Sequence, residues 1–231
     1  MGATPVEVWW SDRRAGDQRT VDTGSLPPAV PAGLSVHRLR QVHGTDVMVV
    51  DAPPPPGCSV WAPSADGRPP EGDAVVAVGS GSCVAVLTAD CAPVALGSPE
   101  GIHSAVHVGW RGLVAGVIDR AVTTMRGLGA TAVVAGLGPT IHPCCYAFGP
   151  ADLDAVAAVA GAGVRSVTSD GGPALDLPAA VRARLRAAGA QVVVDVDRCT
   201  ACGGDGFSHR LRRDEARQAV FVWSLARDGP P

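Results

Sequence analysis

Short runs of apolar, mostly β-branched residues, separated by glycine, proline and aspartate, recur through the first half of this chain. Such runs lie at residues 74–78, 83–88, 94–96 and 104–108. Each run is too short for a helix of ordinary length, and the turn-forming residues between the runs are typical of strand ends. We therefore expect strands to dominate this half of the chain.

Helical periodicity is found in the second half of the chain. Apolar residues recur at helical spacing over 112–126, and Gly127 follows as a stop. Residues 151–160 and 177–188 are also predicted to be helices, the second with Asp176 as its N-cap. Because strands and helices mix without strict βαβ alternation, we predict an α+β fold, a layered, mainly antiparallel or mixed sheet with packed helices. The remaining predicted strands are 47–50, 131–136, 192–196 and 219–225.

A stretch rich in proline and glycine, residues 51–72, is predicted to be a long surface loop rather than a linker between domains. We find no internal repeat. A chain of 231 residues lies within the size range of one domain. The sequence therefore predicts a single domain that spans residues 1–231.

Composition and charge exclude several kinds of partner. Apolar residues make up 46% of the chain and charged residues 18%, which is typical of a soluble globular protein. The net charge of -3 gives no electrostatic reason to expect nucleic acid or an anionic membrane as a partner. No stretch approaches the roughly 18 to 20 apolar residues of a membrane span, and the first residues lack the pattern of a signal peptide. We expect a cytoplasmic monomer.

The chain has seven cysteines, an odd number that favours reduced thiols over a disulfide framework. Cys199 and Cys202 form a C-x-x-C pair, a pattern that a redox site or half of a zinc ribbon also contains. No second C-x-x-C accompanies this pair, and the adjacent Cys144 and Cys145 are poor geometry for a tetrahedral partner. The sequence therefore predicts unlinked thiols at these positions.

His43, Cys91 and His107 stand beside small or turn-forming residues in three separate segments of the chain. Three such ligands from separate strands are what a catalytic zinc ion can use, since its fourth position stays open to water. Taken singly, each of the three is more typical of a turn or of the core than of a metal site. A nucleophile–base pair of Cys91 and His107, oriented by Asp90 or Gln41, is the alternative that the residues leave open.

The sequence as a whole resembles the YfiH-type laccase-domain family, whose members are also called polyphenol oxidoreductases, purine nucleoside phosphorylases or peptidoglycan editing factors. Its three signature blocks are similar to Gln-Val-His-Gly at 41–44, Thr-Ala-Asp-Cys at 88–91 and His-Val-Gly-Trp-Arg-Gly at 107–112. The resemblance implies a layered α+β fold related to a group of thiol hydrolases. Further matching blocks, in order along the chain, are 72–74, 138–146, 197–200, 207–210, and Arg217 with 221–223.

The resemblance implies that His43, Cys91 and His107 bind Zn²⁺. It also implies phosphorolysis of purine nucleosides (adenosine, inosine and methylthioadenosine), with adenosine deamination at the same site. Zinc is favoured over copper, because the four histidines besides His43 and His107 are too few and too scattered for a trinuclear copper cluster. A Cys-His thiol hydrolase and an editing factor in peptidoglycan precursor metabolism are the alternative functions. The expected catalytic residues are Cys91, His107, Asp73 and Asp90, and the expected substrate contacts are Gln41, Arg111, Cys144, Ser208 and Arg210.

The turn at 109–112 leads into the predicted 112–126 helix, where free backbone N–H groups and the helix dipole favour an anion. We expect phosphate to bind there, with Arg111 as added charge and Arg210 as the fallback; a purely structural turn is the alternative. Residues 11–16 only weakly resemble the family's first block. The N-terminal region is therefore expected to be shortened.

Overall fold

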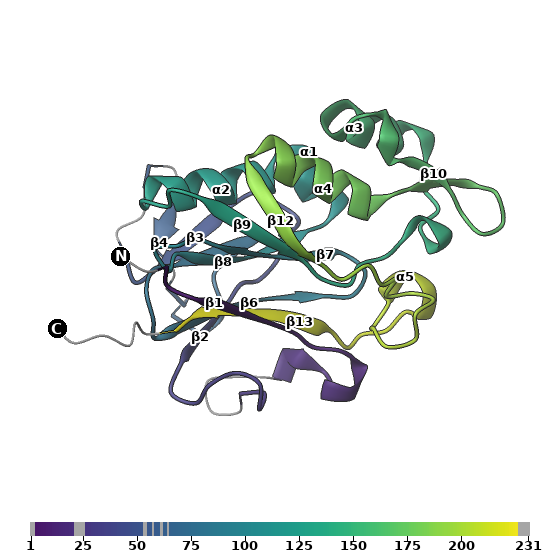
Figure 1. Ribbon diagram of the computed structural model, residues 1–231. Coiled ribbons are helices and arrows are strands. Elements are labelled where there is room, and N and C mark those ends of the chain that lie inside the picture. The colour runs from purple at the N-terminus through teal and green to yellow at the C-terminus, as the bar shows by residue number, and fades with distance from the viewer. Residues whose placement is uncertain are drawn as a thin grey trace.

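A computed structural model describes residues 3–20, 26–52, 55–56, 58–60, 62–63 and 65–225, and the structural statements below concern these residues. Two β-sheets and a layer of helices lie on top of one another (Figure 1). The larger of these sheets has seven strands and the smaller has four. Strands Arg165–Val167 (β10) and Pro173–Leu175 (β11) pair as a separate two-stranded sheet. This layered mixture of strands and helices confirms the predicted α+β fold.

The seven-stranded sheet has the order β12-β9-β7-β8-β5-β3-β4. The central strands β7 and β8 pair antiparallel, whereas β12 with β9 and β3 with β5 pair parallel, so the sheet is mixed. Strands β5, β7 and β8 are buried along their whole length, which explains their continuous apolar runs. The seven strands are Ala190–Asp195 (β12), Val133–Leu137 (β9), Ala92–Gly97 (β7), His103–Val108 (β8), Ala74–Ala77 (β5), Val47–Val50 (β3) and Ser59–Val60 (β4).

The four-stranded sheet has the order β1-β13-β6-β2. The chain leaves this sheet at the end of β6 and enters the larger sheet at β7 after only three residues, 89–91. Cys91 is therefore fixed at a point where the chain passes between two packed layers. The four strands are Val6–Trp10 (β1), Gln218–Ser224 (β13), Ser82–Thr88 (β6) and Ser35–Arg38 (β2).

The predicted helix over 112–126 is two helices that begin at Trp110 rather than at residue 112. Gly116 separates them with φ at 95°, a left-handed conformation that glycine adopts without steric cost. The helices predicted over 151–160 and 177–188 are confirmed to within one residue. None of the described helices is both long and apolar enough to span a bilayer. The helices are Trp110–Ala115 (α1), Val117–Gly127 (α2), Pro150–Ala160 (α3), Leu177–Ala187 (α4) and His209–Arg212 (α5).

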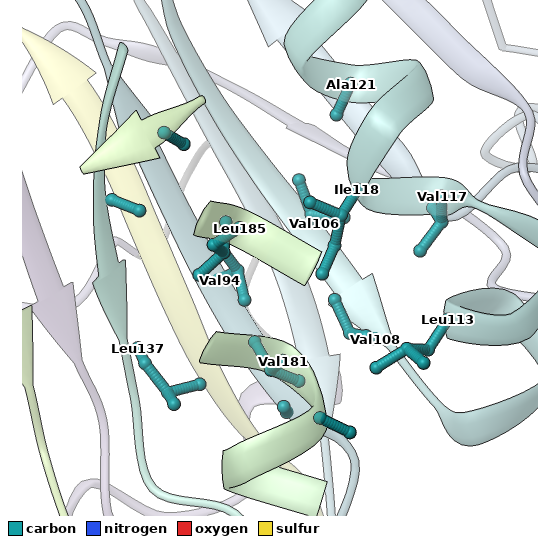
Figure 2. Packing of buried hydrophobic residues seen from close by; sticks show 14 of the residues in the cluster. Val94, Val106, Val108, Leu113, Val117, Ile118, Ala121, Leu137, Val181 and Leu185 are labelled. Atoms are coloured by element: carbon teal, nitrogen blue, oxygen red, sulfur yellow. The ribbon is translucent and has the colours of Figure 1, made fainter. Parts of the chain in front are cut away.

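Helices α1, α2 and α4 cover the face of the larger sheet that points away from the smaller sheet (Figure 1). Figure 2 shows the core between them, where valines of β7 and β8 pack against aliphatic side chains of the three helices. A second buried cluster fills the space between the two sheets. Burial of each valine, leucine or isoleucine stabilises the fold by about 1.5 to 3 kcal/mol, so both layers are firmly attached to β7 and β8.

The stretch at 51–72 is not loop throughout. Its residues Ser59–Val60 form β4, which pairs parallel with β3, and Arg40 forms an isolated bridge with Glu71. Part of the stretch thus extends the seven-stranded sheet, and its last residues pair with the segment that follows β2. Residues 53–54, 57, 61 and 64 of the predicted loop lie outside the described residues.

Candidate functional site: a His-Cys-His centre beside a pocket

Three chain segments at one end of β8 bring His43, Cys91 and His107 together. His107 is the penultimate residue of β8 and lies opposite Pro93 of β7. Cys91 comes directly before β7, so the register of the two strands places it beside the end of β8. His43 comes from the loop that leads into β3.

The three side chains can offer one ligand atom each, and these atoms all lie within 4.8 Å of one another. Sγ of Cys91 is 3.8 Å from Nε2 of His43, and the two imidazole rings meet edge to face with centroids 4.8 Å apart. Zn–N and Zn–S bonds of roughly 2.0 to 2.3 Å place tetrahedral ligand atoms about 3.3 to 3.8 Å apart. The residues therefore fit a zinc ion, and the centre is open to solvent through the exposed His43.

A buried aspartate, Asp73, binds two of the three residues. Its Oδ1 accepts hydrogen bonds from Nδ1 of His107 at 2.7 Å and from the backbone N–H of His43 at 3.0 Å. Its Oδ2 accepts from the N–H groups of Val42 and Gly44 at 3.2 and 2.6 Å. Because the Asp73 side chain has no exposed surface, the geometry favours a positioning role over the predicted catalytic one.

Two non-glycine residues of the site have left-handed backbone, His43 with φ at 60° and Asp90 with φ at 95°. Such conformations cost about 1 to 3 kcal/mol and persist only where the surroundings impose them. Asp73 imposes the first. At Asp90, Oδ1 accepts from the Thr200 hydroxyl at 2.7 Å and Oδ2 from the Arg210 N–H at 2.6 Å. Both oxygens of Asp90 are thus engaged in holding the residue beside Cys91, which favours positioning over the predicted catalytic role.

Gly109 leaves the space that the centre requires. A Cβ at this position would lie 2.5 Å from Cδ2 of His43 and 3.3 Å from Sγ of Cys91. Its φ of -79° is ordinary for any residue, so the requirement is for room and not for conformation. The absence of a side chain at Gly109 is therefore what allows His43 and Cys91 to lie this close to the backbone.

Cys91 and His107 stabilise each other's charged form when no metal is bound. Burial alone would raise the pKa of Cys91, but the charges and hydrogen bonds of His107 and His43 together lower it to about 6. Burial would lower the pKa of His107, but the Cys91 thiolate and the Asp73 carboxylate raise it to about 9. The metal-free pair is therefore a thiolate and an imidazolium at neutral pH.

An open pocket of about 440 Å³ lies against the centre, and all three of its residues line it. Arg19 and Arg217 also line the pocket and give it a positive wall, and His209 is a further lining residue. Oγ1 of Thr88 is buried at the pocket and has no hydrogen-bond partner among the described residues, so a ligand can supply one. The other lining residues are Leu39, Gln41, Leu87 and Ala89.

Three of the predicted substrate contacts are engaged in the fold. Gln41 lines the pocket, but its amide forms two hydrogen bonds with the backbone of Leu87, at 2.7 and 2.8 Å. Ser208 is fully buried and caps α5 by accepting the N–H of Leu211 at 3.2 Å. Cys144 is not among the lining residues, because its thiol lies in a separate cysteine cluster.

The predicted phosphate contacts, Arg111 and Arg210, lie on one aromatic cluster rather than in the pocket wall. The Arg111 guanidinium is 4.3 Å from the Trp110 ring centroid, and that of Arg210 is 4.7 Å from the Tyr146 ring. Phe148 contacts both rings edge on. Helix α1 has only six residues, so its dipole at Arg111 is weaker than the continuous helix predicted from the sequence would give.

The basic residues that do line the pocket were not expected from the sequence as substrate contacts. Arg217 stands in a block that matches the family pattern, which is the signal that could have found it. His209 likewise stands in the matching block 207–210, whereas Arg19 carries no comparable signal. Only the folded chain brings their distant segments beside Cys91.

A layered α+β domain with a His-Cys-His centre at the end of a central strand defines a class of candidate metalloproteins. The chain belongs to the family described as multi-copper polyphenol oxidoreductase laccase, whose model matches residues 26–225. It is similar to purine nucleoside phosphorylase ORF3 of Streptomyces griseus, with 43% identity over 188 residues, 80% of this chain and 72% of the relative.

Solved structures agree with this assignment. A Neisseria meningitidis protein of the DUF152 family is 26% identical with a TM-score of 0.71, over 97% of this chain and 98% of that one. The YfiH protein of Bacillus licheniformis has the same fold, with 24% identity and a TM-score of 0.69 over 81% of this chain and 73% of that one. The predicted YfiH-type family is thereby confirmed.

Proposed function

We propose that this protein is a zinc-dependent purine nucleoside phosphorylase that acts on adenosine, inosine and methylthioadenosine. The observation that carries the proposal is the convergence of His43, Cys91 and His107 on a pocket with a positive wall. The name of the Streptomyces griseus relative, purine nucleoside phosphorylase, supports the choice of reaction.

In phosphorolysis, an oxygen of phosphate forms a bond to C1′ of the ribose while the bond from C1′ to the purine nitrogen breaks. The base leaves with a proton, and ribose 1-phosphate is the second product. The protein must therefore bind an anion next to a sugar. Arg19, Arg217 and His209 offer charged or polar donors for the phosphate oxygens, and the unpartnered Thr88 hydroxyl can bond a ribose hydroxyl.

The chain's own residues prepare the centre before any substrate arrives. Asp73 fixes the ring of His107 and the backbone of His43, so the ligands need little rearrangement. Of the three side chains, only Cys91 would contribute a negative charge, as a thiolate. The centre would therefore keep a net positive charge with a divalent cation bound. Zinc bound there would supply Lewis-acid polarisation of a substrate oxygen.

The experiment is an assay of base release from the three nucleosides by protein purified with zinc and without chelator. Release should require phosphate and should be lost in His43→Ala. Cys58→Ser is the control, because Cys58 lies near Thr124 of α2 and outside the centre. Zinc-loaded protein that releases no base from any nucleoside would contradict the proposal and favour an editing role in peptidoglycan precursor metabolism.

Adenosine deamination is the side activity that we propose for the same pocket. It replaces the purine amino group with oxygen from water and releases ammonia. Both carboxylates that the sequence offered as proton carriers, Asp73 and Asp90, are engaged in the fold. His209, which lines the pocket, is the group left to carry the proton. Appearance of inosine from adenosine, with its loss in His209→Phe, tests this assignment.

Copper and a thiol hydrolase are the competing assignments. Two histidines and one cysteine also suit copper, so elemental analysis of the purified protein decides between the metals. The thiol hydrolase is favoured by the Cys91 thiolate, whose pKa lies near 6 without metal. Turnover of amides or esters that resists chelators but is lost on alkylation would establish that function instead.

A further inference from the structure

Four cysteines form a second cluster that the proposed function does not use. Cys144 and Cys145 come from a 3₁₀ turn, Pro143–Cys145, and Cys199 and Cys202 come from a turn that follows β12. Their sulfur atoms all lie within 4.8 Å of one another. The thiols are unlinked, as the sequence predicts. The expectation that Cys144 and Cys145 are poor geometry for a tetrahedral partner is wrong, because the 3₁₀ turn directs the two adjacent cysteines toward the same point.

The separations match a tetrahedral thiolate site. Sγ of Cys144 is 3.6 Å from those of Cys145 and Cys202 and 3.9 Å from that of Cys199. Four Zn–S bonds of about 2.3 Å in a tetrahedron place the sulfur atoms about 3.8 Å apart. A disulfide requires about 2.05 Å, and all four cysteines are free thiols.

The turn from Cys199 to Gly203 has the features of a thiolate loop for a metal. The backbone N–H of His142 donates to Sγ of Cys199 at 3.4 Å. The turn is closed by the Gly203 N–H, which donates to the Cys199 carbonyl at 3.0 Å. A Cβ at position 203 would lie 2.4 Å from that carbonyl oxygen, so only glycine fits directly after the C-x-x-C pair.

We propose that Cys144, Cys145, Cys199 and Cys202 bind a second, structural zinc ion. Its binding forms four Zn–S bonds, and the thiol protons pass to solvent. Four protein ligands close the coordination sphere, which distinguishes this site from the three-ligand centre at the pocket. Cys202 is exposed and the other three are half-buried, so the ion can enter from solvent.

The position of the cluster gives the second ion a structural role. It joins the 140–146 segment to the 199–203 turn, two segments that both bind Asp90. Ile141 donates its N–H to the Asp90 carbonyl at 2.9 Å, and Thr200 donates its hydroxyl to the Asp90 carboxylate at 2.7 Å. Asp90 precedes Cys91, so the second ion would fix the loop that carries one ligand of the first centre.

Elemental analysis of the full chain tests the proposal, and it needs no nucleoside or activity. The protein is expressed with zinc and purified under reducing conditions without chelator. Wild type should contain two zinc ions per chain, one for each cluster. Cys202→Ser and His43→Ala should each lose one of the two, whereas Cys58→Ser should keep both.

Cobalt identifies which site each variant retains. A site with four thiolates absorbs strongly in the sulfur-to-cobalt charge-transfer region. This absorption should persist in His43→Ala and should fall in Cys202→Ser to the weaker absorption of a site with the single Cys91 thiolate. If wild type contains one zinc ion per chain and His43→Ala loses it, the proposal of a second site is overturned and that of the first site stands. A disulfide among the four cysteines in zinc-loaded, reduced wild type, detected by thiol labelling and mass spectrometry, would also overturn it.

Discussion

Asp73 binds His107 through a 2.7 Å hydrogen bond from Nδ1 of the ring, and neither side chain has more than 4% of its surface exposed. The bond determines that the other ring nitrogen of His107 is the one available to a metal. The same carboxylate accepts three backbone N–H groups from the segment that carries His43. One residue that does not line the pocket therefore orders two of the three ligands.

Asp73→Asn should weaken zinc binding by about ten- to a hundredfold, because the amide presents a donor to N–H groups that need an acceptor. Competition with a chelator of known affinity measures the change. Asp119→Asn is the matched control, since it breaks an ion pair with Arg184 away from the centre. Equal zinc affinity in wild type and Asp73→Asn would show that the hydrogen bond does not order the ligands.

Gly109→Ala should lower zinc content without unfolding the protein, because the added Cβ displaces His43 while φ stays ordinary. Gly149→Ala is the control. Gly149 also precedes a helix with ordinary φ, but a Cβ there meets no atom within 4 Å. Zinc content and melting temperature of both variants are measured together. Full zinc occupancy in Gly109→Ala would contradict the close approach of His43.

Cys91 should react with iodoacetamide at neutral pH in metal-free protein. Its pKa is lowered to about 6, so the thiolate predominates above that pH and the alkylation rate should level off near pH 7. Cys83 is the internal comparison, because burial raises its pKa to about 12. Peptide mapping assigns the label, and zinc should protect Cys91. A rate at Cys91 that still climbs through pH 8 to 9 would refute the thiolate–imidazolium pair.

Arg19→Ala should raise the phosphate KM by roughly ten- to a hundredfold, the effect of losing a charge-assisted hydrogen bond. Arg19 lines the pocket, and its only described side-chain partner is the half-buried Asp17. Arg111→Ala should change the KM little, since Arg111 stacks on Trp110 outside that wall. Zinc content should stay constant in both. The reverse pattern would restore the sequence-based assignment of phosphate to Arg111.

The strands that surround the site are predicted well from the sequence, because continuous apolar runs indicate burial on both faces of a strand. The strands at Val6–Trp10 and Ser35–Arg38 escape prediction, since both are only half-buried and carry polar side chains. The break at Gly116 is also missed, because the apolar spacing continues through it into α2. The apolar periodicity indicates which residues are buried, but it does not indicate that the backbone changes direction at one residue.

The three residues of the His-Cys-His centre follow from the resemblance to the family, whereas their surroundings depend on the fold. Asp73 and His107 are 34 residues apart, and only the pairing of β5 with β8 makes them neighbours. The contribution of Arg19 to the pocket depends likewise on packing that no local pattern records. The cysteine cluster depends on the 3₁₀ turn at Pro143–Cys145, and two adjacent cysteines in a sequence do not indicate such a turn.

The central claim is that zinc held by His43, Cys91 and His107 supports phosphate attack on a nucleoside. Phosphorus NMR of zinc-loaded protein with inosine and inorganic phosphate tests it most directly, because the spectrum follows the attacking group itself. We expect the phosphate signal to be replaced by that of ribose 1-phosphate, in step with hypoxanthine release, and the conversion to stop in His43→Ala. Hypoxanthine release with the phosphate signal unchanged, or conversion that proceeds equally in His43→Ala, would contradict the claim.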